Sequence, residues 1–360
     1  MPAVEQSNTA VFFGNRLFLK GYRRMREGVN PELELGRFLT EVSPFPNIAQ
    51  VLGAVEYLED GAPEPVTLAV LQKFVQNQGD LWQVTLQHLG NMLSMPDPQA
   101  GGSESPGEAA ATGFHLGRMA LLGRRLAELH RALCATTGDP AFDPEPITQA
   151  DVDAWKKGIE AEMEASFAAL AAANERLDGK SREDAQALGR ARERLRARVA
   201  AARAPVEPLM KTRFHGDLHL GQVLVSQDDF IIVDFEGEPG RTMAERRAKS
   251  SVLRDVAGML RSFSYAAHAA RLRREPGSGP SKAALAAVEE WERGAARHFR
   301  EGYLRSAEGL ASVPSDAAAF QSLLDLFLVE KALYELRYEI AHRPDWITIP
   351  LRGLLELAAP

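Results

Sequence analysis

The sequence contains a single cysteine, Cys134, among 360 residues. One cysteine excludes an intrachain disulfide and a zinc centre built from several thiolates. No apolar run is long enough for a membrane-spanning helix, and the N-terminus lacks the pattern of a secretory signal peptide. The net charge of −7 argues against a general nucleic-acid-binding protein and gives no sign of attraction to membranes. These absences predict a cytoplasmic protein without nucleic-acid or membrane partners.

Several catalytic motifs are absent as well. The sequence has no Walker A motif, no G-x-G-x-x-G, no H-E-x-x-H and no G-x-S-x-G. His215 and His219 flank Asp217, but no third nitrogen or sulfur ligand follows nearby, which disfavours a zinc site. The chain has 45% hydrophobic and 25% charged residues, as soluble globular proteins do, and it is long enough for two lobes.

Two neighbouring stretches carry the strongest motif: FHGDLHLGQVLV at 214–225 and IIVDFEGEP at 231–239. Asp217 and Gln222 have the spacing of the Asp and Asn in the kinase motif H-R-D-x-x-x-x-N, and Asp234 begins a D-F-E where kinases have D-F-G. We therefore predict Asp217 as the base and Gln222 and Asp234 as Mg²⁺ ligands. The acids alone would also fit the turns of an ordinary β-hairpin, but the combined pattern favours phosphoryl transfer.

The N-terminal part contains the elements that kinases use for nucleotide phosphates. Residues 11–20 predict a β-hairpin that ends in Lys20, and Asn30-Pro31 predicts the start of a helix. Kinases hold the phosphates of ATP with a strand lysine that a helix glutamate orients. We predict that Lys20 binds the phosphates and that Glu34 orients it, although each residue alone would fit an exposed surface charge.

Strands at 51–58 and 67–75 should complete the small sheet. Kinase-like folds switch lobes after such a strand, where the backbone binds adenine, so we expect nucleotide contacts at Gln72, Phe74 and Val75. The glycine-rich loop that covers ATP in kinases has one candidate here, which starts at Ser7.

The rest of the chain predicts a mostly helical lobe. We expect an α+β, two-lobed, protein-kinase-like fold, with residues 1–75 forming a small antiparallel β-sheet lobe and residues 76–360 a larger helical one. Residues 150–203 predict two antiparallel helices that break near Asp178-Gly179, which we interpret as an insertion without chemistry. Other helices are expected at 81–93, 116–133, 254–270, 282–305 and 316–340.

The last of these helices has an aromatic stripe. Tyr334 and Tyr338 lie on one helical face, with Lys331 on the neighbouring stripe and Trp346 beyond the helix. Such stripes are commonly core residues, but aromatic faces beside polar groups also bind sugar rings. Both interpretations stay open from the residues alone.

The two central motifs, together with Ser7-Asn8-Thr9, residues 29–39, FVQNQGD at 74–80, residues 253–263 and RPDW at 343–346, resemble the bacterial maltokinase family. This family belongs to the aminoglycoside-phosphotransferase-like superfamily and includes the kinase-like part fused to some trehalose synthases. The resemblance covers essentially the whole chain.

The resemblance implies ATP- and Mg²⁺-dependent phosphorylation of maltose at its anomeric hydroxyl, which gives maltose 1-phosphate for α-glucan synthesis. It implies trehalose synthase as a candidate partner. In this family the catalytic residues would be Asp217 and His215, the latter as a brace of the loop. The sugar would contact six side chains: His219, Glu236, Lys331, Tyr334, Tyr338 and Trp346.

The sequence also departs from the family. Members usually carry a further N-terminal segment, so the small lobe is expected to be shortened here. His342 and Ser264 replace residues common in relatives, which leaves the sugar open. The alternatives are a related sugar or aminosugar kinase, such as a glucosamine kinase, and a shortened pseudokinase or regulatory protein. The complete set of Lys20, Asp217, Gln222 and Asp234 argues against a pseudokinase.

Overall fold

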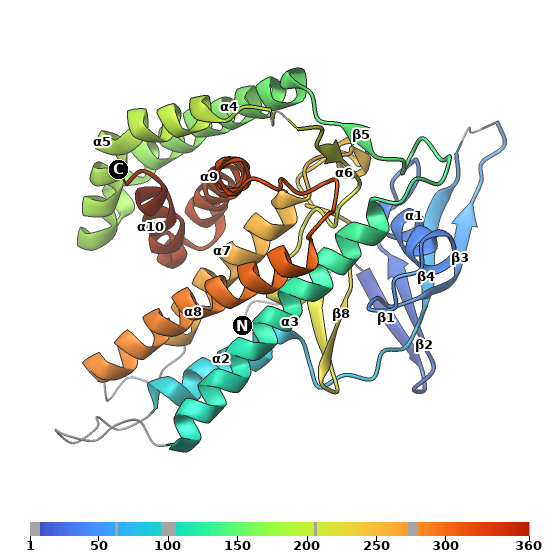
Figure 1. Ribbon diagram of the computed structural model, residues 1–360, viewed down its shortest axis with the longest axis horizontal. Helices are drawn as coiled ribbons and strands as arrows, with labels where there is room; N and C mark the ends of the chain where they lie inside the picture. Colours follow the sequence, from blue (N-terminus) through green and yellow to red (C-terminus); the bar gives the residue numbers. More distant parts are fainter. Residues whose placement is uncertain (1–7, 62–63, 95–105, 205–206, 273–279, 360) are drawn as a thin grey trace.

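The computed structural model describes residues 8–61, 64–94, 106–204, 207–272 and 280–359. It has a small N-lobe, built on a four-stranded antiparallel sheet, and a larger, mostly helical C-lobe (Figure 1). The predicted fold class is therefore confirmed. The N-lobe elements are β1 Asn8–Phe13, β2 Leu17–Tyr22, α1 Pro31–Arg37, β3 Val51–Tyr57 and β4 Val66–Lys73.

The sheet has the strand order β1-β2-β4-β3, so β2 and β4 are its inner strands. The predicted β1–β2 hairpin turns at Gly14, whose φ of +56° suits glycine, and pairs Phe13 with Leu17. Lys20 lies opposite Val70 of β4, in the middle of the sheet. This register places the lysine on a rigid strand that faces α1.

Helix α1 begins as the sequence predicts. The side chain of Asn30 accepts a hydrogen bond from the amide of Leu33, and Pro31 occupies the first helical turn. The helix continues into a π-helical turn, η1 Phe38–Val42. A buried cluster of Leu33, Val51 and Val70 joins α1 to the sheet.

The C-lobe is built around α7 Leu253–Leu272 and α9 Ala317–His342. Two long helices, α3 Pro106–Leu133 and α8 Lys282–Ser306, run side by side next to them (Figure 1). Their close approach depends on Gly123 and Gly302, because a Cβ at either position would collide with the backbone of the other helix. Three shorter C-lobe helices are α2 Leu81–Leu93, α6 Met243–Arg247 and α10 Thr348–Leu357.

The predicted insertion forms α4 Gln149–Ala173 and α5 Gly179–Ala201, with Asp178 capping the second helix. It is not a peripheral addition. Ser166 of α4 donates a hydrogen bond to the carbonyl of Leu333 in α9, and Arg198 of α5 binds Asp325 at 2.7 Å. The insertion is therefore part of the C-lobe packing.

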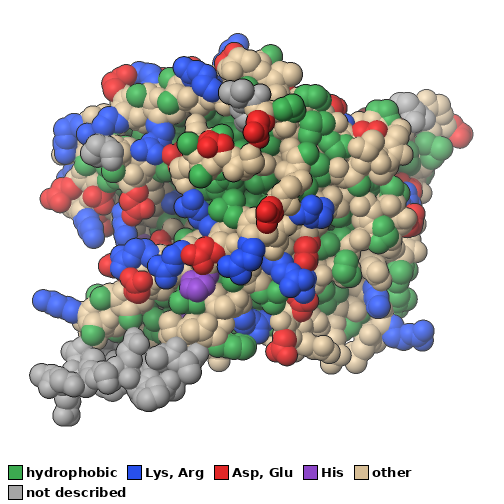
Figure 2. Space-filling view, in the orientation of Figure 1, with side chains coloured by type: hydrophobic (Ala, Val, Ile, Leu, Met, Phe, Trp, Pro, Cys, Tyr) green, Lys and Arg blue, Asp and Glu red, His purple; other side chains and the backbone are tan. Residues whose placement is uncertain are grey.

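Other details differ from the sequence expectations. The predicted loop at 94–113 is shorter than expected, since α3 begins at Pro106, and residues 95–105 lie outside the described residues. Among the described residues, no helix combines the length and apolar composition needed to cross a bilayer. On the face in Figure 2, basic and acidic side chains are interspersed over the C-lobe helices.

Candidate active site

The two central motifs form a loop and a short hairpin. Strands β7 Val223–Ser226 and β8 Asp229–Ile232 pair directly, and the side-chain amide of Gln222 donates to Oδ2 of Asp234 at 2.8 Å. Asp234 has a φ of +70°, which is unusual for a residue other than glycine. The hairpin thus brings together the two side chains that the spacing predicts as metal ligands.

The loop before the hairpin is held by Asp255 near the start of α7. Its carboxylate accepts hydrogen bonds from the amides of His215 at 2.8 Å and Gly216 at 2.9 Å, and contacts Nε2 of His130 at 3.1 Å. Burial alone would raise the pKa of Asp255, but the contact with His130 and the hydrogen bond from the amide of Gly216 hold that pKa below its usual value. Asp255 thus fixes the backbone that presents Asp217.

His215 acts within the same framework. Its Nε2 donates to the carbonyl of Val233 at 3.0 Å, and its Nδ1 faces the amide of Asp217 at 3.3 Å. Both ring nitrogens are therefore engaged by backbone groups. This geometry matches the predicted brace and makes His215 a positioning residue for Asp217.

Lys20 lies in a cluster of three carboxylates at the junction of the lobes. Its Nζ is 2.7 Å from Oε2 of Glu32, 2.6 Å from Oδ1 of Asp234 and 2.6 Å from Oε1 of Glu236. Burial alone would lower the pKa of Lys20, but the carboxylates raise it above its usual value, so the lysine stays charged. Asn8 of β1 also donates to Glu236, at 2.7 Å.

The predicted pairing of Lys20 with Glu34 is wrong. Glu32 is the buried helix glutamate that contacts Lys20, whereas Glu34 binds Arg213 at 2.8 Å and Arg247 at 2.7 Å. Residues two apart on a helix point to different sides, so only one of the two glutamates can face the sheet. The sequence did not show which, because the choice depends on how α1 rotates against β2 and β4.

The carboxylate cluster fits a divalent cation. The ligand oxygens of Glu32, Asp234 and Glu236 lie within 4.8 Å of one another, and Gln222 adds an amide side chain. One ammonium and three carboxylates carry a formal charge of −2, and burial raises the pKa of Glu32 despite the lysine. Oxygen ligands with excess negative charge are what Mg²⁺ prefers, so the donor set is suitable for it.

A cavity of about 420 Å³ opens beside Asp217 on the C-lobe side. The rings of Tyr334 and Tyr338 in α9 stack along it, with centroids 6.4 Å apart and an interplanar angle of 24°. His219 also lines this cavity, which we call the acceptor cavity because it lies beside the predicted base Asp217. Burial lowers the pKa of the His219 imidazole. Two further aromatic residues, which the sequence analysis missed, complete the lining: Trp82 and Tyr265.

Two carboxylates in the same cavity were also missed. Glu335 contacts Arg261 at 2.8 Å, and Glu339 contacts Arg343 at 2.7 Å. Burial raises the pKa of Glu339 above its usual value, although Arg343 opposes the shift. The acceptor cavity therefore combines aromatic faces with acidic groups.

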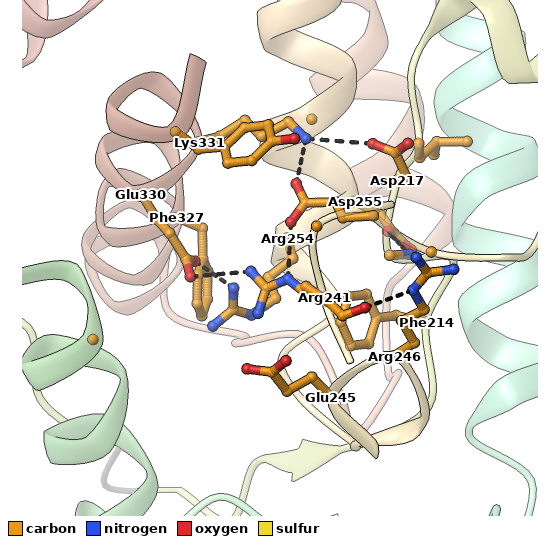
Figure 3. Close-up of a pocket in the computed structure, with 18 of the residues that line it drawn as sticks. Phe214, Asp217, Arg241, Glu245, Arg246, Arg254, Asp255, Phe327, Glu330 and Lys331 are labelled. Atoms are coloured by element: carbon orange, nitrogen blue, oxygen red, sulfur yellow. Dashed lines mark hydrogen bonds and ion pairs between the residues drawn. The ribbon is translucent and has the colours of Figure 1, made fainter. Parts of the chain in front are cut away.

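A second cavity, of about 410 Å³, shares Asp217 and Lys331 with the first cavity as lining residues (Figure 3). The Nζ of Lys331 is 3.4 Å from Asp217 and 2.5 Å from Glu238. Glu238 also binds Arg241 at 2.8 Å, and Glu330 binds both Arg241 and Arg254. An alternating chain of charges thus runs from Asp217 across the loop after the D-F-E motif to α9 and α7.

The charges along this chain are strongly coupled. Burial alone would raise the pKa of Glu238, but Lys331 and Arg241 lower it to about 2. Glu238 and Asp217 in turn raise the pKa of Lys331. Lys331 is therefore a charged neighbour of Asp217, held in place by Glu238.

Three predicted contact residues have other surroundings, and a fourth cannot be placed. Trp346 does not line either cavity beside Asp217; it packs under Arg343 at 4.7 Å and beside Tyr265. Glu236 belongs to the Lys20 cluster rather than to the acceptor cavity. Gln72 is buried and donates to Glu32 at 3.4 Å. Ser7 lies outside the described residues.

Two backbone groups of the predicted adenine-binding segment already have hydrogen-bond partners within the chain. The amide of Phe74 donates to the carbonyl of Arg16 at 2.9 Å, and the carbonyl of Val75 accepts from the side chain of Asn77 at 2.9 Å. A base at this point would have to use the remaining backbone groups. The role of this segment stays a prediction.

Comparison with known proteins gives a family match and structural neighbours that cover most of this chain. Residues 103–265 match the model of the phosphotransferase enzyme family. The chain is 29% identical over 244 residues to a glucosamine kinase of Streptacidiphilus jiangxiensis, covering 66% of this chain and 48% of that protein. It is 23% identical over 348 residues to a glucosamine kinase of Mycolicibacterium smegmatis, covering 96% of this chain and 76% of that protein.

The fold agrees with solved structures of glucosamine kinase. One of them, in complex with glucosamine, ADP and inorganic phosphate, superposes with a TM-score of 0.73 at 22% identity over 97% of this chain and 76% of that chain. A second crystal form gives a TM-score of 0.72. The chain spans about half the length of the Streptacidiphilus relative. The family match covers residues 103–265, so this part of the chain, which includes Asp217, Gln222 and Asp234, is similar to the phosphotransferase enzyme family.

Proposed function

We propose that this chain is an ATP-dependent kinase that phosphorylates a hydroxyl group of an amino sugar of the glucosamine class. The observation that carries the proposal is the acceptor cavity, in which aromatic rings and two carboxylates lie beside Asp217. The relatives named glucosamine kinase support the amino sugar over maltose, the acceptor that the family resemblance implied.

The nucleotide side is built from residues of both lobes. Lys20, oriented by Glu32, binds the phosphates of ATP as a charged donor. Mg²⁺ held by Asp234, Gln222 and Glu236 would neutralise charge on the phosphates during transfer. Because these groups come from β2, α1 and the β7–β8 hairpin, the reactive phosphate is presented where the lobes meet.

The acceptor side places a hydroxyl against Asp217. The carboxylate accepts the hydroxyl proton as the oxygen attacks the terminal phosphate in line. Asp255 and His215 fix the loop, and Lys331 holds the carboxylate from the side. Positioning of this kind accounts for most of the catalysis in phosphoryl transfer.

The carboxylates of the acceptor cavity explain a preference for an amine. The ring of the sugar lies against Tyr334 and Tyr338, while its ammonium is attracted to the acidic side of the cavity. Arg261 contacts Glu335 through Oε2, at 2.9 Å from Nε and 2.8 Å from Nη2, which leaves Oε1 for the ammonium. A neutral sugar could offer this oxygen only a hydroxyl donor, without the positive charge that strengthens the contact.

The test is a panel of sugars with Mg-ATP, followed by ADP release. We expect turnover with glucosamine and a large loss with N-acetylglucosamine, because acetylation removes the positive charge. Asp217→Asn should lower kcat by about 10²- to 10⁴-fold, the usual contribution of a general base. Asp228→Asn, an exposed acid at the hairpin turn, is the matched control and should keep full activity.

Other outcomes would change the proposal. Equal rates with glucosamine and N-acetylglucosamine would contradict recognition of the amine. Turnover with maltose alone would favour the maltokinase prediction. A folded chain without turnover on any sugar would favour the pseudokinase alternative.

A further inference from the structure

A third cavity, of about 480 Å³, shares no lining residue with the two cavities beside Asp217. It is bounded by α6 and by a two-stranded ribbon of β5 Glu145–Pro146 and β6 Met210–Lys211. Four of its nine lining residues are basic, and Glu145 is the acidic one. The basic residues are Lys211, Arg213, Arg247 and Lys249.

Arg213 has hydrogen-bond donors without acceptors. The residue is 1% exposed, and its Nη1 donates to Glu34 at 2.8 Å. Its Nε and Nη2 are also buried, and neither has a hydrogen-bond acceptor among the described residues. The guanidinium lies over the ring of Phe142, with its Cζ 5.2 Å from the ring centroid. The ring has no oxygen or nitrogen atom that could accept a hydrogen bond from Nε or Nη2. Burial lowers the pKa of Arg213, as expected for a cation that lacks full compensation.

Glu145 already behaves as an anion at the mouth of this cavity. Its side chain is 49% exposed, and the carboxylate bridges Lys249 at 2.7 Å and Lys211 at 3.5 Å. Lys249 also donates to the carbonyl of Pro140 at 2.7 Å, and Lys211 also binds Asp151 at 2.7 Å. A surface carboxylate can swing away, so the two ammonium groups can accept a competing anion.

The remaining arginine completes a basic wall. Arg247 binds Glu34 through Nε at 3.0 Å and Nη2 at 2.7 Å, next to Arg213 on the same carboxylate. Glu34 and Asp151 are each committed to a basic residue of the cavity, whereas the side chain of Glu145 can move. Three further acids lie close enough to interact with the basic residues: Glu64, Asp139 and Asp143. A ligand with several strong acceptor oxygens would satisfy more donors than a carboxylate does.

We propose that this cavity binds a phosphate dianion, either free or as part of a sugar phosphate, in place of the Glu145 carboxylate. The phosphate oxygens accept from Lys211 and Lys249, and Arg213, which lines the cavity with an incompletely compensated guanidinium, adds its positive charge. Only the two arginines of the cavity would separate the bound anion from α1, because both arginines contact Glu34 of that helix. This proposal does not depend on the identity of the sugar acceptor.

The test is isothermal titration of the full chain with inorganic phosphate at constant ionic strength, balanced with chloride. Glu145→Gln removes the competing carboxylate and should tighten binding by about fivefold. Lys249→Gln removes a donor and should weaken binding by about the same factor. Glu183→Gln, an exposed acid on α5, is the matched control and should leave the Kd unchanged.

Two results would overturn the proposal. One is the same Kd in all four chains, which would place the phosphate at the Lys20 site instead. The other is no binding to Glu145→Gln at tens of millimolar phosphate, although the melting temperature shows a folded chain. Glucose 6-phosphate identifies the source: tighter binding than phosphate, with the same response to both substitutions, assigns the site to sugar phosphates. Equal binding assigns it to free phosphate.

Discussion

Replacement of Asp255 by Asn should separate the placement of the catalytic loop from the chemistry of Asp217. Asp255 is 1% exposed and accepts the amides of His215 and Gly216, one on each carboxylate oxygen. An asparagine offers one acceptor oxygen, so one amide keeps its bond and the other faces an NH₂ group. The substitution therefore leaves a buried backbone donor without an acceptor in the loop that carries Asp217.

The magnitude follows from these contacts. A lost hydrogen bond to a charged group, with its partner left buried, costs about 2–3 kcal/mol. If the loop bears this cost at the transition state, kcat falls by about 30- to 160-fold. The KM for ATP should stay within about threefold, because no contact of Lys20, Gln222 or Asp234 changes.

The assay is steady-state kinetics on the best acceptor, combined with urea unfolding. Asp325→Asn is the matched control: Asp325 is also buried and binds Arg198, but it lies on the α5 side of α9. The control should lose stability and keep kcat. The reasoning is refuted if Asp255→Asn keeps kcat within threefold, or if both variants lose kcat equally.

Three further predictions test other parts of the site. Glu238→Gln removes the charge of the carboxylate nearest to Lys331, at 2.5 Å. We expect kcat to fall by roughly tenfold with the ATP KM unchanged. A changed ATP KM with an unchanged kcat would contradict the role of the charge chain. Glu32→Gln weakens the ion pair of Lys20, the lysine that we propose binds the phosphates, and should raise the ATP KM by roughly tenfold, whereas a raised sugar KM would count against it. Burial lowers the pKa of His115 from 6.5 to about 3, so the folded chain holds this histidine neutral while the unfolded chain takes up its proton below pH 6.5. The contribution of neutral His115 to the free energy of unfolding is therefore complete above pH 6.5 and should fall by about 2 kcal/mol at pH 5. The difference in unfolding free energy between wild type and His115→Leu should shrink by that amount between pH 8 and pH 5; the exposed His342→Gln variant serves as control, and a constant difference would disprove the effect.

The parts of the site that the sequence predicted are local in the chain. Asp217, Gln222 and Asp234 belong to one loop and one short hairpin, so their spacing alone brings Gln222 and Asp234 into contact. The helices of the C-lobe were predictable for the same reason, since capping residues and periodicity act within a few turns. Tyr334 and Tyr338 also follow from helical periodicity.

The missed parts depend on tertiary packing. The choice between Glu32 and Glu34 follows from the rotation of α1 on the sheet, which no pattern within α1 encodes. Glu238 directly follows the D-F-E-G run, yet only the approach of α9 makes it the partner of Lys331. Trp346 was predicted in the sugar site from its place after α9, but the turn η4 Pro344–Trp346 packs it against Arg343 instead.

The small core of the N-lobe has a consequence for how the protein is handled. Leu33, Val51 and Val70 form a separate cluster, and the ties from β1 and β2 to the C-lobe include the charged or polar contacts of Lys20 and Asn8 with Asp234 and Glu236. A sheet with so little buried surface should open locally more often than the helical lobe. A nucleotide at 100 times its Kd would add about 2.7 kcal/mol to the closed form. ATP should therefore act as a folding ligand that protects this lobe from proteases during purification and storage.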